Sequence, residues 1–304
     1  MDIFLLLVGL TILVLGAEIV IRGSVSFGKK INISLFTIGV VIVAGGTSLP
    51  ELASSINAVL NYHSDLALGA VVGSNIANLI LVMAATAIIL PITNITINQI
   101  NQAWINIALG IGLVIMSYLY FNYIFGIISI ILLTYIMYLQ IKKGSLNIED
   151  VSKSDYSIII SISLIIFGVI FLIYGSELFV SSAINLANIF DVSEAVIGLS
   201  LIAFGTSLPE LVVGIMSAIK RKVDFALGNI LGSNIYNVLG VLGISSFFGK
   251  FTMPDILAKQ DLYFMLIITF LILGLMFFFK KLGRIYGSIG LVVYLCYMYF
   301  IFIS

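Results

Sequence analysis

Apolar runs long enough to cross a lipid bilayer fill most of this 304-residue chain. A membrane-spanning helix needs about 20 mainly apolar residues, and ten such runs occur along the sequence. They lie near residues 2–21, 33–60, 66–90, 104–120, 123–141, 156–182, 194–219, 225–247, 261–279 and 284–303. Only 9% of the residues are charged, whereas soluble domains carry about 25%. We therefore predict an all-α polytopic membrane protein with ten transmembrane helices.

The chain also repeats itself at a spacing of 159 residues. Rare polar residues recur at this spacing as Glu18 and Glu177, Glu51 and Glu210, Asp65 and Asp224, Ser74 and Ser233, and Asn78 and Asn237. Shared composition alone would not align rare residues in this way, so we infer an internal duplication. The prediction is a first five-helix repeat over residues 1–142, a cytoplasmic linker over 143–155, and a second five-helix repeat over 156–304.

The basic residues predict how the chain crosses the membrane. Twelve of the 14 Lys and Arg residues fall in loops on the side away from the two termini. The positive-inside rule makes that side cytoplasmic, so both termini are expected outside a plasma or inner membrane. Because each repeat has an odd number of helices, the second repeat enters the membrane inverted. Inverted repeats are typical of secondary transporters, whose binding sites lie near the bilayer midplane between the repeats.

One motif occurs in both repeats, inside the second and seventh apolar runs. Gly-Thr-Ser-Leu-Pro-Glu occupies residues 46–51 and again 205–210. A carboxylate at membrane depth is unfavourable by roughly 3 kcal/mol on insertion scales, so its repetition indicates a function. Proline has no N–H and interrupts the helix ladder. The motif therefore predicts broken second and seventh helices, with the first break near residues 44–47 and free carbonyls around Ala44.

The predicted site consists of oxygen ligands alone. Hydroxyls three and four residues before each Glu share a helix face with it, and the third and eighth helices add Ser and Asn side chains. The full set is Ala44, Thr47, Ser48, Glu51, Ser74 and Asn78, with Ala203, Thr206, Ser207, Glu210, Ser233 and Asn237. All-oxygen coordination suits Ca²⁺ and Na⁺ rather than zinc or copper. Two carboxylates balance one Ca²⁺ or two Na⁺.

Structural explanations remain open for several of these residues. Ser48 and Glu51 also match a capping box, in which the Ser side chain caps the helix and Glu reaches back. Buried Ser and Asn residues can simply form hydrogen bonds between helices, and Gly69, Gly73, Gly228 and Gly232 are expected to permit close helix packing. Glu18 and Glu177 lie near helix ends, where a structural role is expected.

The paired motifs, each followed by Gly-Ser-Asn-Ile-x-Asn at 73–78 and 232–237, resemble the two α-repeats of the sodium/calcium exchanger family. The chain looks most like the compact prokaryotic calcium/sodium antiporters, and the resemblance covers nearly its whole length. It implies several cation positions around Glu51 and Glu210, and a first and sixth helix that slide across the others. Some relatives carry an acidic residue where this chain has Asn237, which leaves the coupling ion and the stoichiometry open.

We therefore predict a secondary active antiporter, not an enzyme, that exchanges Ca²⁺ for Na⁺ by alternating access. We expect a monomer in the lipid bilayer with no cofactor and, because the net charge is zero, no nucleic-acid partner. A Ca²⁺/H⁺ exchanger on the same fold is the nearest alternative, and a cation channel with paired Glu residues is another. An intramembrane hydrolase lacks a plausible base, because the only histidine, His63, lies in a short loop.

Overall fold

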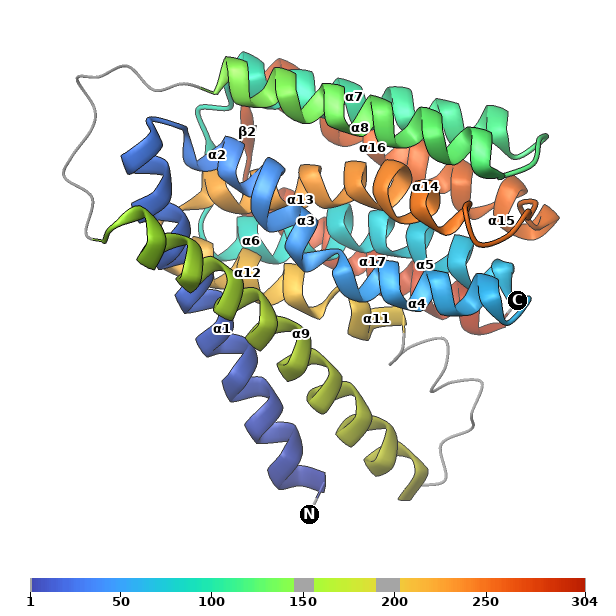
Figure 1. Ribbon diagram of the computed structural model, residues 1–304, viewed down its shortest axis with the longest axis horizontal. Coiled ribbons are helices and arrows are strands. Elements are labelled where there is room, and N and C mark those ends of the chain that lie inside the picture. The colour runs from blue at the N-terminus through green and yellow to red at the C-terminus, as the bar shows by residue number, and fades with distance from the viewer. Residues whose placement is uncertain (1, 145–155, 190–202, 304) are drawn as a thin grey trace.

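A bundle of helices makes up the computed structural model, which describes residues 2–144, 156–189 and 203–303 (Figure 1). The first half contains α1 (Asp2–Ile31), α2 (Leu35–Ile38), η1 (Gly39–Val43), α3 (Ala44–Thr47), α4 (Leu49–Leu60), α5 (Ser64–Ala77), η2 (Asn78–Val82), α6 (Met83–Ile89), β1 (Ile92–Thr93), α7 (Ile97–Met116) and α8 (Tyr123–Lys143). The second half contains α9 (Ile158–Ile189), α11 (Ala203–Thr206), α12 (Leu208–Ile219), α13 (Val223–Ile235), η5 (Tyr236–Val241), α14 (Leu242–Ser245), α15 (Asp255–Lys259), α16 (Asp261–Phe279), β2 (Lys281–Leu282) and α17 (Arg284–Ile303).

The length and polarity of these helices confirm a multi-pass, all-α membrane protein. Within the described residues, eight helices are long and apolar enough to span a bilayer, or nine if the bent pair Leu35–Thr47 and Leu49–Leu60 forms one span. The predicted seventh span, 194–219, is represented by the short apolar helix α12, and residues 194–202 lie outside the described part. A single pairing of two-residue strands, β1 with β2, ties the loop after α6 to the loop after α16.

The predicted break in the second helix is present at a slightly different residue. The axis bends by 40° between Thr47 and Leu49, so the break falls at Ser48 rather than at 44–47. Pro50 lies in the first turn of α4, where a missing N–H has no intrahelical partner to lose. The second copy has the same form, because α11 ends at Thr206 and α12 begins at Leu208 with Pro209 in its first turn.

In the described part of the chain, three π-helical segments lie beside the two motifs. Segment η1 directly precedes α3, η2 begins at Asn78, and η5 contains Asn237. Short π turns inside α-helices occur frequently at functional sites. Their positions therefore mark the same part of the bundle as the repeated polar residues do.

Helices α1 and α9 form an antiparallel pair that is splayed away from the other helices (Figure 1). Small residues at seven-residue intervals allow their backbones to touch. A Cβ atom on Gly16 would lie 2.9 Å from the carbonyl oxygen of Gly168, and one on Gly9 would lie 3.0 Å from that of Gly175. Gly23 lies equally close to the backbone of Ser161. Such small-residue seams are typical of helix pairs in membranes, where close packing replaces the hydrophobic effect.

Close packing at Gly228 and Gly232 confirms the expectation for that part of α13. The same expectation is wrong for Gly69 and Gly73 on α5, where an added Cβ atom would meet no atom of a neighbouring described element within 4 Å. A Cβ atom on Gly228 would overlap the carbonyl oxygen of Phe36, and one on Gly232 would lie 2.8 Å from the backbone of Val40. The broken second helix therefore rests directly on α13. This contact brings the first motif against the eighth apolar run of the other half.

The glycine seam gives a test of the α1–α9 packing. Replacing Gly16 with Ala places a methyl group against α9 backbone, and overpacking of this kind destabilises by about 1–3 kcal/mol. The melting temperature of the detergent-purified protein, followed by circular dichroism, should fall by ~2–10 °C. Gly112→Ala is the matched control, because no atom of the described chain lies within 4 Å of that position. Equal melting temperatures for both variants would contradict the packing described.

Candidate cation-binding site

The two repeated carboxylates lie in the centre of the bundle. Glu51 in the first turn of α4 and Glu210 in that of α12 are both fully buried. Each carboxylate accepts one hydrogen bond at Oε1, from Ser74 Oγ at 3.2 Å and from Ser233 Oγ at 3.3 Å respectively. The two halves of the chain thus contribute matching Ser–Glu pairs to one centre.

Hydroxyl groups join each pair to the motif of the opposite half. Ser207 Oγ donates to Ser74 Oγ at 3.2 Å. Thr47 Oγ1 lies 3.4 Å from Ser233 Oγ. Because every one of these contacts crosses between the halves, neither half can form the centre alone.

Several buried oxygen atoms in this centre lack a hydrogen-bond partner within the described chain. They are Oε2 of Glu51, Oε2 of Glu210, Oγ of Ser48, Oδ1 of Asn78 and Oδ1 of Asn237. Buried polar atoms are nearly always hydrogen-bonded, so each exception needs an explanation. Carboxylate, amide and hydroxyl oxygens are the ligands that Ca²⁺ and other hard cations prefer. The unpaired atoms therefore form a candidate cation site that includes both carboxylates.

The capping-box interpretation is wrong for the two motif serines. Ser48 and Ser207 precede α4 and α12, yet neither side chain caps its helix. Ser48 Oγ has no partner in the described chain, and Ser207 Oγ bonds Ser74 instead. Both serines are 2% exposed, and neither hydroxyl bonds the end of its own helix.

The structure gives different outcomes for the remaining predicted ligands, Ala44, Thr206 and Ala203. The Ala44 carbonyl is not free as expected, because it accepts a hydrogen bond from Ser48 N at 3.1 Å. Thr206 is half-buried at the end of α11. Ala203 begins that helix at the edge of the described segment, so its role as a carbonyl ligand stays a prediction.

Three asparagines that the sequence interpretation passed over also belong to this centre. Asn75 and Asn234 are 3% exposed and contact each other, and they recur at the 159-residue spacing that could have revealed them. Asn229 is fully buried and accepts a hydrogen bond from Thr47 Oγ1 at 3.3 Å. It has no repeat signal, because Ala70 occupies the equivalent position in the first half.

Other acidic and titratable candidates lie outside the centre. Glu18 forms ion pairs with Arg22 at 2.5 Å and with Lys220 at 2.6 Å, which joins α1 to the end of α12. This confirms the structural role expected for it. Glu177 and His63 are exposed. The described residues contain no group of three or more His, Cys, Asp and Glu side chains that could hold a metal ion.

Comparison with known proteins places the whole chain in one family. Residues 1–142 and 160–303 match the family described as "Sodium/calcium exchanger protein". An uncharacterised membrane protein of Methanocaldococcus jannaschii is 35% identical over 95% of this chain and 94% of its own length. The inner membrane protein YrbG of Escherichia coli is 29% identical over 87% of this chain and 85% of its own. The solved sodium-calcium exchanger NCX_Mj, soaked with Na⁺, superimposes with a TM-score of 0.86 at 33% identity, covering 97% of both chains.

The two carboxylates predict how Ca²⁺ should affect stability. A ligand at 100 times its Kd stabilises a protein by about 2.7 kcal/mol, so Ca²⁺ should raise the melting temperature of the purified wild-type protein. Glu51→Gln and Glu210→Gln each remove half of the charge that binds the ion, and each should abolish the increase. Glu18→Gln, a carboxylate outside the centre, is the control and should keep it. A full Ca²⁺-dependent increase in either central variant would contradict the site.

Proposed function

We propose that this chain, which belongs to the sodium/calcium exchanger family, exchanges Ca²⁺ for Na⁺ across the membrane by alternating access. The observation that carries the proposal is the pair of fully buried carboxylates with unpaired Oε2 atoms, one from each half. Intramembrane carboxylates that face the interior of a bundle mark ion pathways. Antiport of Ca²⁺ against an inward Na⁺ gradient would export Ca²⁺ from the cell.

Competition for the same two charges explains why the ions would exchange. One Ca²⁺ or two Na⁺ neutralise Glu51 and Glu210, and both loads cannot occupy the site together. An empty site leaves two negative charges in a low-dielectric interior, where their repulsion is strongest. An unloaded protein should therefore change its access slowly, which couples the outward movement of one ion to the inward movement of the other.

The proposed ligands are the oxygen atoms that surround these carboxylates. Hydroxyl and carboxamide groups supply neutral ligands, which suit Na⁺ and complete the coordination of Ca²⁺. The proposed set comprises Glu51 and Glu210 with Ala44, Thr47, Ser48, Ser74, Asn78, Ala203, Thr206, Ser207, Ser233 and Asn237. Because Asn237 is neutral, binding of a third Na⁺ would leave the site with one net positive charge.

The proposed architecture is two inverted five-helix repeats, residues 1–142 and 156–304, joined by a cytoplasmic linker at 143–155. We place both termini outside, in a plasma or inner membrane, because the basic loops lie on the other side. The relative YrbG is an inner membrane protein, which supports this location. The antiparallel pair α1–α9, which is splayed from the remaining helices (Figure 1), is the element that we propose to slide between the two access states.

Transport by the purified protein in liposomes tests this function directly. Vesicles loaded with Na⁺ should take up Ca²⁺ when diluted into Na⁺-free buffer, and uptake should stop when Na⁺ is equal on both sides. Gradients of K⁺ and H⁺ are imposed one at a time for comparison. Glu51→Gln and Glu210→Gln should abolish the flux, whereas Glu18→Gln should retain it.

Uptake that follows a pH gradient in the absence of Na⁺ would instead identify a Ca²⁺/H⁺ exchanger. Flux that continues without any counter-ion would identify a channel. Either result would refute Na⁺ as the coupling ion.

A further inference from the structure

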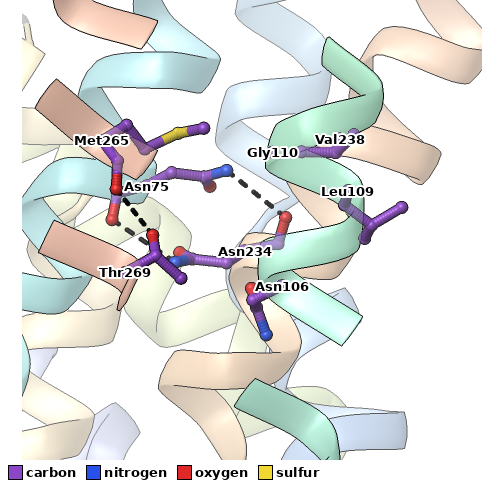
Figure 2. A pocket seen from close by; sticks show the side chains of 8 residues that line it. All are labelled: Asn75, Asn106, Leu109, Gly110, Asn234, Val238, Met265 and Thr269. Atoms are coloured by element: carbon purple, nitrogen blue, oxygen red, sulfur yellow. Dashed lines mark hydrogen bonds between the residues drawn. The ribbon is translucent and has the colours of Figure 1, made fainter. Parts of the chain in front are cut away.

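Two asparagines, Asn75 and Asn234, bond each other across the boundary between the halves (Figure 2). Asn75 Nδ2 donates to the backbone carbonyl of Asn234 at 3.5 Å, and Asn234 Nδ2 donates to that of Asn75 at 3.3 Å. A backbone carbonyl can only accept a hydrogen bond. The two carbonyls therefore determine which end of each carboxamide faces them, and that end must be the NH₂ group.

The orientation of these two amides also determines the orientation of the Asn237 and Asn78 amides. The Oδ1 atom of Asn75 accepts a hydrogen bond from Asn237 Nδ2 at 3.0 Å, and Oδ1 of Asn234 accepts one from Asn78 Nδ2 at 2.9 Å. A carboxamide oxygen cannot donate, so Asn237 and Asn78 must also present their NH₂ groups here. The four side chains form a crossed network in which each half orients the proposed ligand of the other.

This orientation determines where the side-chain oxygens of Asn78 and Asn237 lie in the proposed cation site. With Nδ2 occupied, Oδ1 of Asn78 and Oδ1 of Asn237 are left buried and without a partner in the described chain. Asn237 Nδ2 also donates to Ser74 Oγ at 3.1 Å, and that hydroxyl donates to Glu51. The Asn237 amide therefore contacts the same hydroxyl group that is hydrogen-bonded to the Glu51 carboxylate. A reversed amide would direct its positively polarised NH₂ group where its oxygen now lies.

The surroundings of Asn75 and Asn234 offer few other hydrogen-bond partners to a reoriented amide group. The cavity beside it holds only about 10 Å³ and is lined by Asn106 and Thr269, among others (Figure 2). Thr269 Oγ1 already donates to Met265 O, and Asn106 Nδ2 to Leu231 O. About 10–15 Å³ is the least that accommodates one water molecule. There is therefore little solvent to satisfy a reoriented amide, and the network strongly favours one orientation.

We propose that Asn75 and Asn234 are positioning residues, which orient Asn237 and Asn78 so that oxygen rather than NH₂ faces the bound cation. This inference rests on the proposed function, because it takes the carboxylate centre as the place where Ca²⁺ and Na⁺ bind. It assigns a role to residues that carry no charge and need not touch an ion. It also explains why a neutral amide can serve at position 237 of this chain.

Ca²⁺ affinity, measured from the Ca²⁺ dependence of the melting temperature of the purified full chain, tests the proposal. Asn75→Leu has a similar shape but no hydrogen bonds, so Asn237 is free to rotate. Affinity should fall about tenfold, the effect of losing roughly one charge-assisted hydrogen bond. In an Asn237→Asp background both side-chain oxygens are equivalent, so orientation no longer matters. There Asn75→Leu should reduce affinity less than about threefold.

The mirror-image cycle, Asn234→Leu with and without Asn78→Asp, provides an independent second measurement. If a Leu variant does not fold, Thr takes its place, because its short side chain cannot bond both partners of Asn75 or Asn234. Asn106→Leu is the matched control, since Asn106 lines the same cavity and bonds only backbone carbonyls. Its Ca²⁺ affinity should stay within about twofold of wild type.

Unchanged affinity in Asn75→Leu would overturn the proposal. So would an equal loss of affinity with and without the Asn237→Asp substitution, because a purely structural role predicts that result. Failure of the exchange function is distinguishable from both outcomes. In that case wild-type protein binds Ca²⁺ with the predicted pattern among the variants but shows no Na⁺-driven Ca²⁺ flux in liposomes.

Discussion

Burial of two carboxylates in one centre, without enough hydrogen bonds to satisfy them, is the constraint on which the structure depends. Charges removed from water are strongly unfavourable unless they are paired or coordinate a metal. Glu51 and Glu210 have no basic partner recorded in the described chain, and each keeps one oxygen unbonded. The ion pairs recorded in the described chain involve Glu18 and Asp255, so no Lys or Arg side chain is recorded as neutralising Glu51 or Glu210. Cations from outside the protein would neutralise these charges, which is the role that we propose for the centre.

The rest of the bundle brings this centre together from two halves. Breaks at Ser48 and Ser207 start new helices inside the bundle, so that the carboxylates in their first turns lie at its centre. Glycines on α13 let the first broken helix approach closely. Hydrogen bonds between Thr47 and Ser233, and between Ser207 and Ser74, then cross between the halves. Because the contacts are reciprocal, a shift of one half relative to the other must alter both carboxylates' surroundings together.

The sequence was sufficient to predict the membrane class and the importance of the buried Glu51 and Glu210, because both depend on local patterns. Apolar length identifies helices, and a repeated Pro–Glu motif marks the break and the charge. Hydropathy placed the fourth span at 104–120, whereas α7 begins at Ile97. Its first turn is polar and is started by a capping box of Thr96 and Gln99, a signal that a hydropathy count does not use. The inverted ten-helix arrangement stays a prediction.

Other features depend on contacts between distant residues, which no single-sequence pattern reports. The role of Asn229 follows from its contact with Thr47, 182 residues away. The seam between α1 and α9 joins glycines that become neighbours only after both helices fold. Amide orientation at Asn78 and Asn237 is set by the backbone carbonyls of two other residues. Composition and spacing can place such residues at the centre, but only three-dimensional packing determines which atom faces it.

Crystals of the protein soaked with Ca²⁺ and measured by anomalous diffraction test the central claim most directly. The account predicts an anomalous peak between Glu51 and Glu210, at about 2.3–2.6 Å from a carboxylate oxygen of each, which is the usual Ca²⁺–oxygen distance. The peak should weaken as Na⁺ is added, because both ions require the same oxygens. A peak bound to only one of the two residues, or Ca²⁺ located elsewhere with the centre unoccupied, would contradict it.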